Sequence, residues 1–254
     1  MSRRAFVLKE LGLSPVWVRR RGANVAGRVE AGSIAGVQAA AIDGAGLCAG
    51  SAATGDRVAR IHAMDWAQLK SSASACTACV LHQSRKQAVL GVGDEKAEWL
   101  FVGEGPGAEE DERGEPFVGQ AGKLLDNMLA AIALKRGSNV YIANVVKCRP
   151  PGNRTPEPAE AQACAPYLAR QIELMRPRLI VALGKVAAQN LLGIEATLAS
   201  LRGRIHQVRG TPLIVTYHPA YLLRSLVDKS KSWEDLCLAV ETMKALKQQP
   251  AVPN

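Results

Sequence analysis

The sequence predicts an α/β fold in which a mostly parallel sheet lies between helices. From residue 99 onward, short apolar runs alternate with segments whose apolar residues recur at helical spacing. Segments that are rich in glycine or proline follow several of the apolar runs, as is usual where a strand ends. The chain contains no internal repeat. Alternating units of this length imply a sheet that is covered by helices.

Four strands are expected, each a short apolar run, at residues 99–102, 140–146, 179–183 and 212–217. Helices are expected at residues 123–129, 158–175, 185–192 and 232–246, and another begins at Asp65 and ends near Cys76. Ser232 is the expected start of the last helix, with Asp235 as its capping-box partner.

Residues 1–60 are expected to be a largely flexible extension, and residues 61–250 the folded domain. The extension is rich in Ala, Gly and Arg, and no apolar period in it lasts longer than one turn. Leu8 to Trp17 is expected as a short docking helix, and Ala23 to Gly55 as a flexible linker. The extension carries +5 of the formal net charge of +9.

Composition restricts the compartment and the partners. No run of eighteen apolar residues and no apolar signal-peptide core is present, so we expect a cytoplasmic protein that does not contact membranes. A pI near 9.5 favours polyanionic partners. The six cysteines do not imply a disulfide framework in such a compartment, so their spacing decides their role.

The segment from Gly103 to Gly122 carries the most unusual chemistry in the chain. It follows the strand expected at 99–102, and ligands bind at that edge of open α/β sheets. Gly105 lets the backbone approach a ligand, Pro106 stiffens the turn, and Phe117 offers a flat apolar face. Four consecutive acids follow at 109–112. A solvated acidic loop is an equally good interpretation of this stretch alone, whereas a phosphate cradle fits it poorly.

Four of the cysteines have a spacing that suits a metal site. Cys76 and Cys79 form a CxxC pair, and Cys148 and Cys164 lie far along the chain. One tight pair with two separate thiols favours an iron–sulfur cluster over a zinc ribbon, which usually has two tight pairs. Four unrelated structural thiols remain the alternative. A cluster here would join the segment before the domain to its body.

Two further loops follow expected strands. Asn144 either satisfies buried backbone groups or reads the edge of a base with its paired donor and acceptor. The rigid Pro-rich segment after it carries Arg149 and Arg154, which suit contacts with phosphates. Gly184 and Lys185 open a helix whose amides can hold a phosphate, although a plain glycine turn is an equally good interpretation.

The last such loop contains His218, which is either a structural residue or a functional one. It follows the strand expected at 212–217, so it lies at the edge where ligands bind. The apolar pair Leu222 and Leu223 stands beside Arg224. Such a pair is unusual in an exposed loop unless it inserts into a partner.

Five segments together resemble the family 4 uracil-DNA glycosylases, the iron–sulfur branch of the uracil-DNA glycosylase superfamily. They are GEGPGAEED, PFVGQAGKLLD, NVVKCRPPGNRTP, VALGKVAA and HPAYLLR. The resemblance covers about residues 65–246. It implies a three-layer α/β/α fold around a parallel four-stranded sheet, a [4Fe-4S] cluster, and excision of uracil from DNA. Uracil-containing DNA is then the partner, and a monomer is expected.

The resemblance also implies roles for single residues. Cys76, Cys79, Cys148 and Cys164 fall on the cluster positions, and Cys48 and Cys237 do not. Phe117 would stack on uracil, and Asn144 would read its N3–H and O4. Glu110 would exclude the methyl group of thymine. His218 would donate to O2 as negative charge develops, together with backbone amides near Gly105 and Pro106.

The water-positioning group is left open among Glu104, Glu110 and a main-chain carbonyl, because Gly105 stands where another branch of the superfamily has an aspartate. Leu222 resembles the wedge that fills the space left by a flipped base, and Arg224 would hold a phosphate. The other expected DNA contacts are Asn153, Arg154, Gly184 and Lys185.

Two other functions stay open on the sequence. One is a cluster-bearing module that binds DNA or uracil without turnover, which the presence of both Asn144 and His218 argues against. The other is a variant that captures uracil covalently through a basic loop containing a histidine. The stretch Leu201 to His206 is superficially similar to such a loop, but it lies far along the chain from Asn144.

Overall fold

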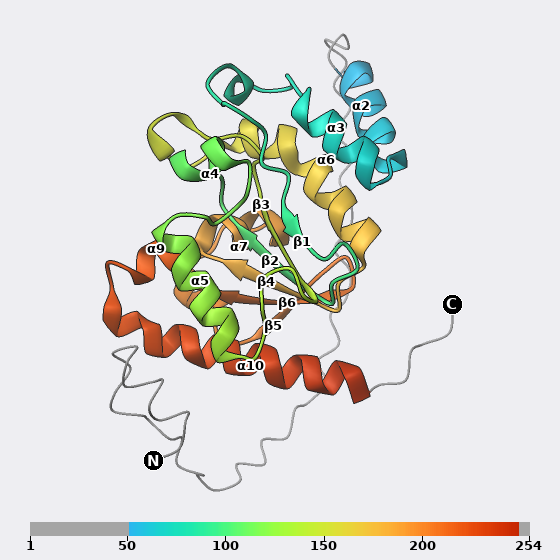
Figure 1. The fold of residues 1–254 in the computed structure, drawn as a ribbon. Coiled ribbons are helices and arrows are strands. Elements are labelled where there is room, and N and C mark those ends of the chain that lie inside the picture. The colour runs from blue at the N-terminus through green and yellow to red at the C-terminus, as the bar shows by residue number, and fades with distance from the viewer. Residues whose placement is uncertain (1–50, 249–254) are drawn as a thin grey trace, which may run out of the picture. The chain divides into compact units, whose positions relative to one another are not determined.

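The computed structural model describes residues 51–248 (Figure 1). Within these residues, six strands form a single sheet in the order β1-β3-β2-β4-β6-β5. The inner four strands are parallel: β3 (Val140–Asn144), β2 (Trp99–Gly103), β4 (Leu179–Leu183) and β6 (Thr211–Thr216). The expected parallel four-stranded core is therefore confirmed.

The two edge strands were not expected from the sequence. β1 (Val92–Gly93) pairs antiparallel with β3, and β5 (Ile205–Val208) pairs antiparallel with β6. β1 has only two residues, and most of β5 is at least partly exposed. Neither strand therefore produces the continuous apolar run that marks the four inner strands, which are buried along almost their whole length.

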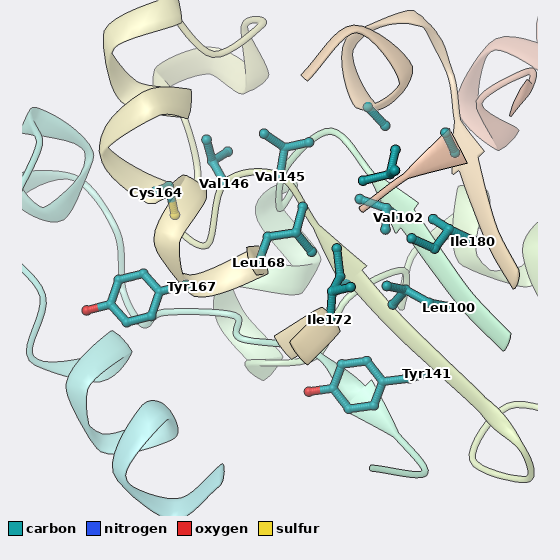
Figure 2. Close-up of a cluster of buried hydrophobic side chains, with 14 of the residues drawn as sticks. Leu100, Val102, Tyr141, Val145, Val146, Cys164, Tyr167, Leu168, Ile172 and Ile180 are labelled. Carbon is teal, nitrogen blue, oxygen red and sulfur yellow. The ribbon is translucent and has the colours of Figure 1, made fainter. Parts of the chain in front are cut away.

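Helices cover both faces of the sheet, because alternate residues of each strand point to opposite faces. On one face, Leu100 and Ile180 pack in a core with α6 (Pro158–Met175) and α7 (Lys185–Leu192). Figure 2 shows Leu168 and Ile172 of α6 in this core beside Leu100. On the other face lie α5 (Gln120–Ala131) and α10 (Lys229–Gln248) (Figure 1). The three-layer α/β/α arrangement is confirmed.

The remaining elements are short or lie before the sheet. They are α2 (Ser51–Ala63), α3 (Trp66–Ser74), η1 (Val80–Gln83), α4 (Ala108–Arg113), η2 (Pro151–Asn153), α8 (Leu198–Leu201), α9 (Pro219–Leu222) and η3 (Leu226–Asp228). No helix within residues 51–248 has the length and apolarity that crossing a bilayer requires.

Several expected boundaries need correction. The linker expected through Gly55 is wrong for residues 51–55, which open α2, and α2 packs against α6. The rest of that linker and the helix expected at 8–17 lie outside the described residues, so the domain boundary at residue 60 stays a prediction. The strand expected at 140–146 is β3, which ends at Asn144. Beyond its end, the Val146 N–H still donates to the Glu104 carbonyl (3.2 Å).

The start of the last helix was also misplaced. α10 begins at Lys229, three residues before the expected cap. Ser232 instead exchanges a hydrogen bond with the Thr216 hydroxyl (2.8 Å). Asp235 accepts from Arg202 (2.7 Å) rather than from a helix terminus. Both side chains are buried against neighbouring elements, which is why their capping-box spacing misled.

Candidate active site

A cavity of about 530 Å³ opens at the carboxyl edge of the parallel strands. This volume is in the range of small-molecule sites. The register places Gly103 at the end of β2 beside Asn144 at the end of β3, and Leu183 of β4 beside Thr216 of β6. The loops that follow these strands supply most of the lining, which comprises Glu104, Gly105, Pro106, Gly107, Glu110, Phe117, Ala121, Asn144, Pro150, Asn153, Arg154, Thr155, Pro156, His218, Ala220, Tyr221 and Arg224.

Asn144 presents a buried acceptor at this cavity. Its side chain is 1% exposed, and among the described residues its Oδ1 has no hydrogen-bond partner. Buried polar atoms are nearly always satisfied, so an orphaned oxygen in a cavity wall points to a ligand that donates to it. Gly103 lets the side chains of Asn144 and Phe117 pack against the strand, because a Cβ there would lie 2.5 Å from both Asn144 Oδ1 and Phe117 Cζ.

Phe117 forms a flat apolar wall of the same cavity. Its side chain is buried, and its ring centroid lies 5.4 Å from that of His218 at an interplanar angle of 32°. Phe117 has a φ of 56°, in the left-handed region that bulky residues rarely adopt. A planar ligand that pairs with Asn144 therefore has an aromatic face within reach.

His218 is held as a neutral donor. Its Nδ1 accepts from the backbone N–H of Ala220 (3.1 Å), so in the neutral imidazole the proton is on Nε2. Burial, supported by the positive charge of Arg224 and opposed by Glu110, lowers the pKa of His218 to about 4. Gly184 packs directly against it, since a Cβ at Gly184 would lie 3.0 Å from the His218 Cβ. Gly184 thus serves close packing as well as the start of α7.

Two acids border the cavity in different ways. The Glu110 carboxylate accepts from the backbone N–H groups of Gly107 (3.1 Å), Val118 (2.9 Å) and Gly119 (3.1 Å). It therefore joins α4 to the Phe117 loop, and the acidic run is a short helix rather than a solvated loop. Burial raises the pKa of the Glu104 carboxyl above its usual range, while a hydrogen bond to Thr155 opposes that shift.

The expected DNA contacts are placed unevenly. Leu222, the residue expected as the wedge, is only 1% exposed and packs with Met128 and Leu236, so it is not free to enter DNA in this conformation. The neighbouring Leu223 is 44% exposed. α9 thus turns the first leucine of the pair into the core and leaves the second exposed. Arg224 is exposed at the cavity mouth, and Lys185 is exposed at the start of α7.

The Pro-rich loop is braced internally. Arg154 donates to both Glu160 oxygens (2.8 and 2.6 Å), and Asn153 accepts from Arg149 (2.7 Å). Arg154 is therefore an ion-pair partner of Glu160, and its expected contact with a phosphate stays a prediction. A bidentate arginine–carboxylate pair suits a loop whose shape must be fixed. Both Asn153 and Arg154 nevertheless border the cavity.

A second, small cavity of about 10 Å³ is lined by Cys76, Cys79, Cys148 and Cys164. Cys76 and Cys79 lie in the loop between α3 and η1, Cys148 lies in the segment after β3, and Cys164 lies in α6. Among residues 51–248, no three His, Cys, Asp or Glu side chains lie close enough together to hold a single metal ion. The sulfur atoms thus surround a space rather than converge on one point.

Cationic groups that the sequence did not single out surround this second cavity. Arg85 donates to Cys148 Sγ (2.9 Å), and Arg57 donates to Cys76 Sγ (3.6 Å). The backbone N–H of Lys147 donates to Cys164 Sγ (3.3 Å). Burial raises the pKa of the Cys148 thiol, and that of Cys164 to about 12, while the donors and positive charge of Arg85 and Lys147 oppose this rise. Groups that oppose protonation of sulfur suit a metal group that is bound by thiolates. The only sequence signal for Lys147 was a lysine inside an apolar run, directly before Cys148.

Lys147 also connects the two cavities. Its side chain is 2% exposed, and its ammonium donates to the Asn144 carbonyl (2.7 Å) and to Gln171 Oε1 (2.6 Å). Burial lowers the pKa of Lys147 to about 8, with Cys164 and Cys148 opposing the shift. One buried cation therefore supports the strand end that carries Asn144 and lies beside two of the cysteines.

The histidine of the alternative covalent mechanism lies elsewhere. His206 is on the edge strand β5, and its Nε2 is 2.7 Å from the Leu201 carbonyl oxygen. It is not among the residues that line the cavity. No observation on the described residues therefore favours covalent capture of a base by this loop.

Comparisons with known proteins agree with this geometry. The model of the uracil DNA glycosylase superfamily matches residues 90–238. The chain is 51% identical to the type-4 uracil-DNA glycosylase of Archaeoglobus fulgidus over 58% of its own length and 78% of that protein. It is 44% identical to the type-4 enzyme of Pyrobaculum aerophilum (69% and 93% of the two chains) and 49% identical to that of Thermotoga maritima (59% and 79%). The chain belongs to the type-4 uracil-DNA glycosylases, within the uracil-DNA glycosylase superfamily.

Proposed function

We propose that this chain, as a type-4 uracil-DNA glycosylase, flips uracil out of DNA and hydrolyses its N-glycosidic bond, which releases free uracil and leaves an abasic site. The observation that carries the proposal is the unpaired, buried Asn144 Oδ1, which shares one cavity with an aromatic face and a neutral histidine donor. Extrusion of the nucleotide costs a few kcal/mol and lets the cavity receive the base.

Recognition of uracil follows from the donors and acceptors of Asn144. Its Oδ1 accepts from uracil N3–H, and its amide N–H donates to O4. Cytosine has an acceptor at N3 and a donor at C4, so it opposes each group of Asn144 with a like group. A buried polar group left unpaired in this way costs about 1–3 kcal/mol. Phe117 stacks on the ring and holds it in the plane that Asn144 reads.

Rejection of thymine is the role that the geometry of Glu110 supports. Both carboxylate oxygens accept backbone N–H groups, so the side chain is a fixed wall of the cavity. A pocket that merely lacks attraction for a methyl group discriminates by only about 1–3 kcal/mol, whereas a rigid wall excludes it sterically. The same hydrogen bonds favour this role over the alternative role of Glu110 in positioning water.

His218 supplies the chemistry at the departing base. As the C1′–N1 bond breaks, its electron pair leaves with uracil, and negative charge spreads to O2. The Nε2–H of His218 donates to that oxygen. Backbone N–H groups of the loop that contains Gly105 and Pro106 add to the stabilisation. Water attacks C1′, its oxygen forms the new bond, and its proton passes to Glu104. Burial raises the pKa of Glu104, which makes its carboxylate a better proton acceptor than an ordinary glutamate.

Contact with DNA is proposed for residues around the mouth. Leu223 is the apolar side chain free to enter the space that the flipped base leaves, in place of the buried Leu222. Arg224 and Lys185 hold phosphates, together with the amides that open α7 at Gly184. One chain carries all of these groups, so we propose a monomer that acts on uracil-containing DNA.

Cys76, Cys79, Cys148 and Cys164 are the residues that would hold a [4Fe-4S] cluster. Four thiolates are the usual ligands of such a cluster, and Arg57, Arg85 and Lys147 supply donors and positive charge. When bound, the cluster would tie the segment before the sheet to the strand end at Cys148 and to α6. Thiols persist in the reducing cytoplasm, where we place the protein.

Release of free uracil from a uracil-containing oligonucleotide tests the function directly, with a matched thymine oligonucleotide as control. Asn144→Asp places a carboxylate where the amide donated to O4. We expect single-turnover release to collapse and cytosine to be excised at most in traces. A protein that binds the oligonucleotide but releases no uracil would instead be a binding module. Unchanged release by Asn144→Asp would remove Asn144 from base recognition.

A further inference from the structure

The strained backbone of Phe117 is held from two sides. Its positive φ of 56° costs free energy for a bulky residue and persists only where the surroundings impose it. Glu110 fixes the amides of the next two residues, Val118 and Gly119. Glu110 does not hold the carbonyl groups of the same turn, so another residue must fix them.

Arg136 occupies the carbonyl side. It lies between α5 and β3, 19 residues after Phe117. Its Nη1 donates to the Pro116 carbonyl (2.8 Å), and its Nη2 donates to the Phe117 carbonyl (2.8 Å). The fork of the guanidinium thus spans two consecutive carbonyls, which the single ammonium of a lysine does not match.

Arg136 is itself held in place. Its Nε donates to Asp126 Oδ1 of α5 (3.0 Å), and its side chain is 22% exposed. The start of α5 lies directly against the same turn, because a Cβ at Gly122 would lie 1.7 Å from the Phe117 carbonyl oxygen. The turn is therefore fixed between Glu110 on its amides and Arg136 on its carbonyls.

We propose that Arg136 is a positioning residue for uracil excision: by holding the carbonyls of Pro116 and Phe117, it keeps the Phe117 ring at the cavity wall and against His218. The inference rests on the proposed function of this site. Arg136 touches neither the base nor the reacting atoms. It acts by making the stacking conformation of Phe117 the dominant one before uracil arrives.

The size of the effect depends on the fraction of molecules in which Phe117 holds its stacking conformation. If release of the carbonyls lets Phe117 relax, the competent fraction falls by roughly 10- to 100-fold, and the apparent affinity for uracil falls with it. Arg136→Gln removes the fork, and Arg136→Lys keeps the charge without the bidentate geometry. Both variants should therefore bind uracil more weakly than the parent protein. Arg136→Lys should recover at most part of the affinity that Arg136→Gln loses.

A double-mutant cycle with Phe117→Ala separates positioning from general stability. Single-turnover release of uracil from an oligonucleotide and binding of free uracil by calorimetry are measured for the parent, Arg136→Gln, Phe117→Ala and the double variant. The loss caused by Arg136→Gln should disappear in the Phe117→Ala background. Arg178→Gln is the control, because Arg178 is also a partly exposed partner of a carboxylate (Glu98, 3.7 Å) but precedes β4, away from the cavity.

The outcomes are distinct. An equal loss in both backgrounds, or no loss in either, overturns the positioning role, and thermal melts show whether each variant is folded. Failure of the proposed function appears in the parent protein, which would then release no uracil. Calorimetric binding of free uracil still reads the effect of Arg136 in that case, because it needs no turnover.

Discussion

Replacement of His218 by alanine should separate catalysis from DNA binding. The imidazole is positioned by the Ala220 N–H and lies against the Phe117 ring, so it presents Nε2–H to the cavity without needing to reorganise. Loss of one such donor to a developing anion costs about 3–4 kcal/mol, or roughly 10²- to 10³-fold in the chemical step. The affinity for DNA should change little, because phosphate contacts supply most of it.

The pH profile gives a second, independent reading of the same residue. A pKa near 4 keeps the imidazole neutral from about pH 5 upward. Its shift from an ordinary value near 6.5 corresponds to about 3 kcal/mol against the charged form. Charging would occur only as the pH falls through the folded pKa, so the single-turnover rate should show no step between pH 5.5 and 7.5 that belongs to His218.

Single-turnover release of uracil from an oligonucleotide, at several pH values and with DNA affinity measured in parallel, decides both points. His206→Ala is the matched control, because His206 lies on β5 outside the cavity, where its ring forms a hydrogen bond with the Leu201 carbonyl of α8. A His218→Ala protein that cleaves at the parental rate would refute the donor role. A rate step near pH 6.5 that disappears in His218→Ala would refute the neutral imidazole.

Three further predictions concern the wedge, the cysteines and the extension. Leu223→Ala should slow excision from duplex DNA with stability unchanged within about 0.5 kcal/mol, whereas Leu222→Ala should lower the free energy of unfolding by about 2–5 kcal/mol; the opposite pattern in rates and melts would restore Leu222 as the wedge. Cys148→Ser should lower the iron and sulfide content per chain, and an unchanged content would show that Cys148 is not a ligand. Deletion of residues 1–50, which carry seven Lys/Arg and three Asp/Glu, should leave cleavage intact and make the dependence of DNA affinity on salt shallower; equal slopes would mean that this segment does not contact DNA.

Strands and helices with strong local signals were predictable from the sequence. α6 begins at Pro158 and α7 ends before Gly193, as expected where proline opens a helix and glycine closes one. Parallel pairing brings the strand ends to one edge of the sheet. That Asn144 and His218 line the same cavity was therefore predictable from the topology. The edge strands lacked any such signal, because a two-residue strand and a largely exposed one have no apolar run.

Side-chain direction was not predictable in the same way. Leu222 and Leu223 are chemically identical neighbours, and only the turn of α9 decides which one packs on Met128. Arg154 looked like a free cation because its partner, Glu160, follows on the first turn of α6. Ser232 and Asp235 have capping-box spacing, yet tertiary contacts take both side chains. For Leu222, Ser232 and Asp235 the competing partner comes from the folded arrangement, whereas the partner of Arg154 lies only six residues along the chain.

The stretch from Asn144 to Cys148 contributes residues to both cavities. Its first residue offers the unpaired amide oxygen, and its last residue lines the cysteine cavity. Between them, Lys147 donates to the Asn144 carbonyl through its side chain and to Cys164 Sγ through its backbone. A buried ammonium with two neutral oxygen acceptors is costly unless negative charge lies nearby, and thiolates beside it would supply that charge. The positive charge beside Cys164 and Cys148 therefore also fixes the strand end that carries Asn144, so one side chain serves both cavities.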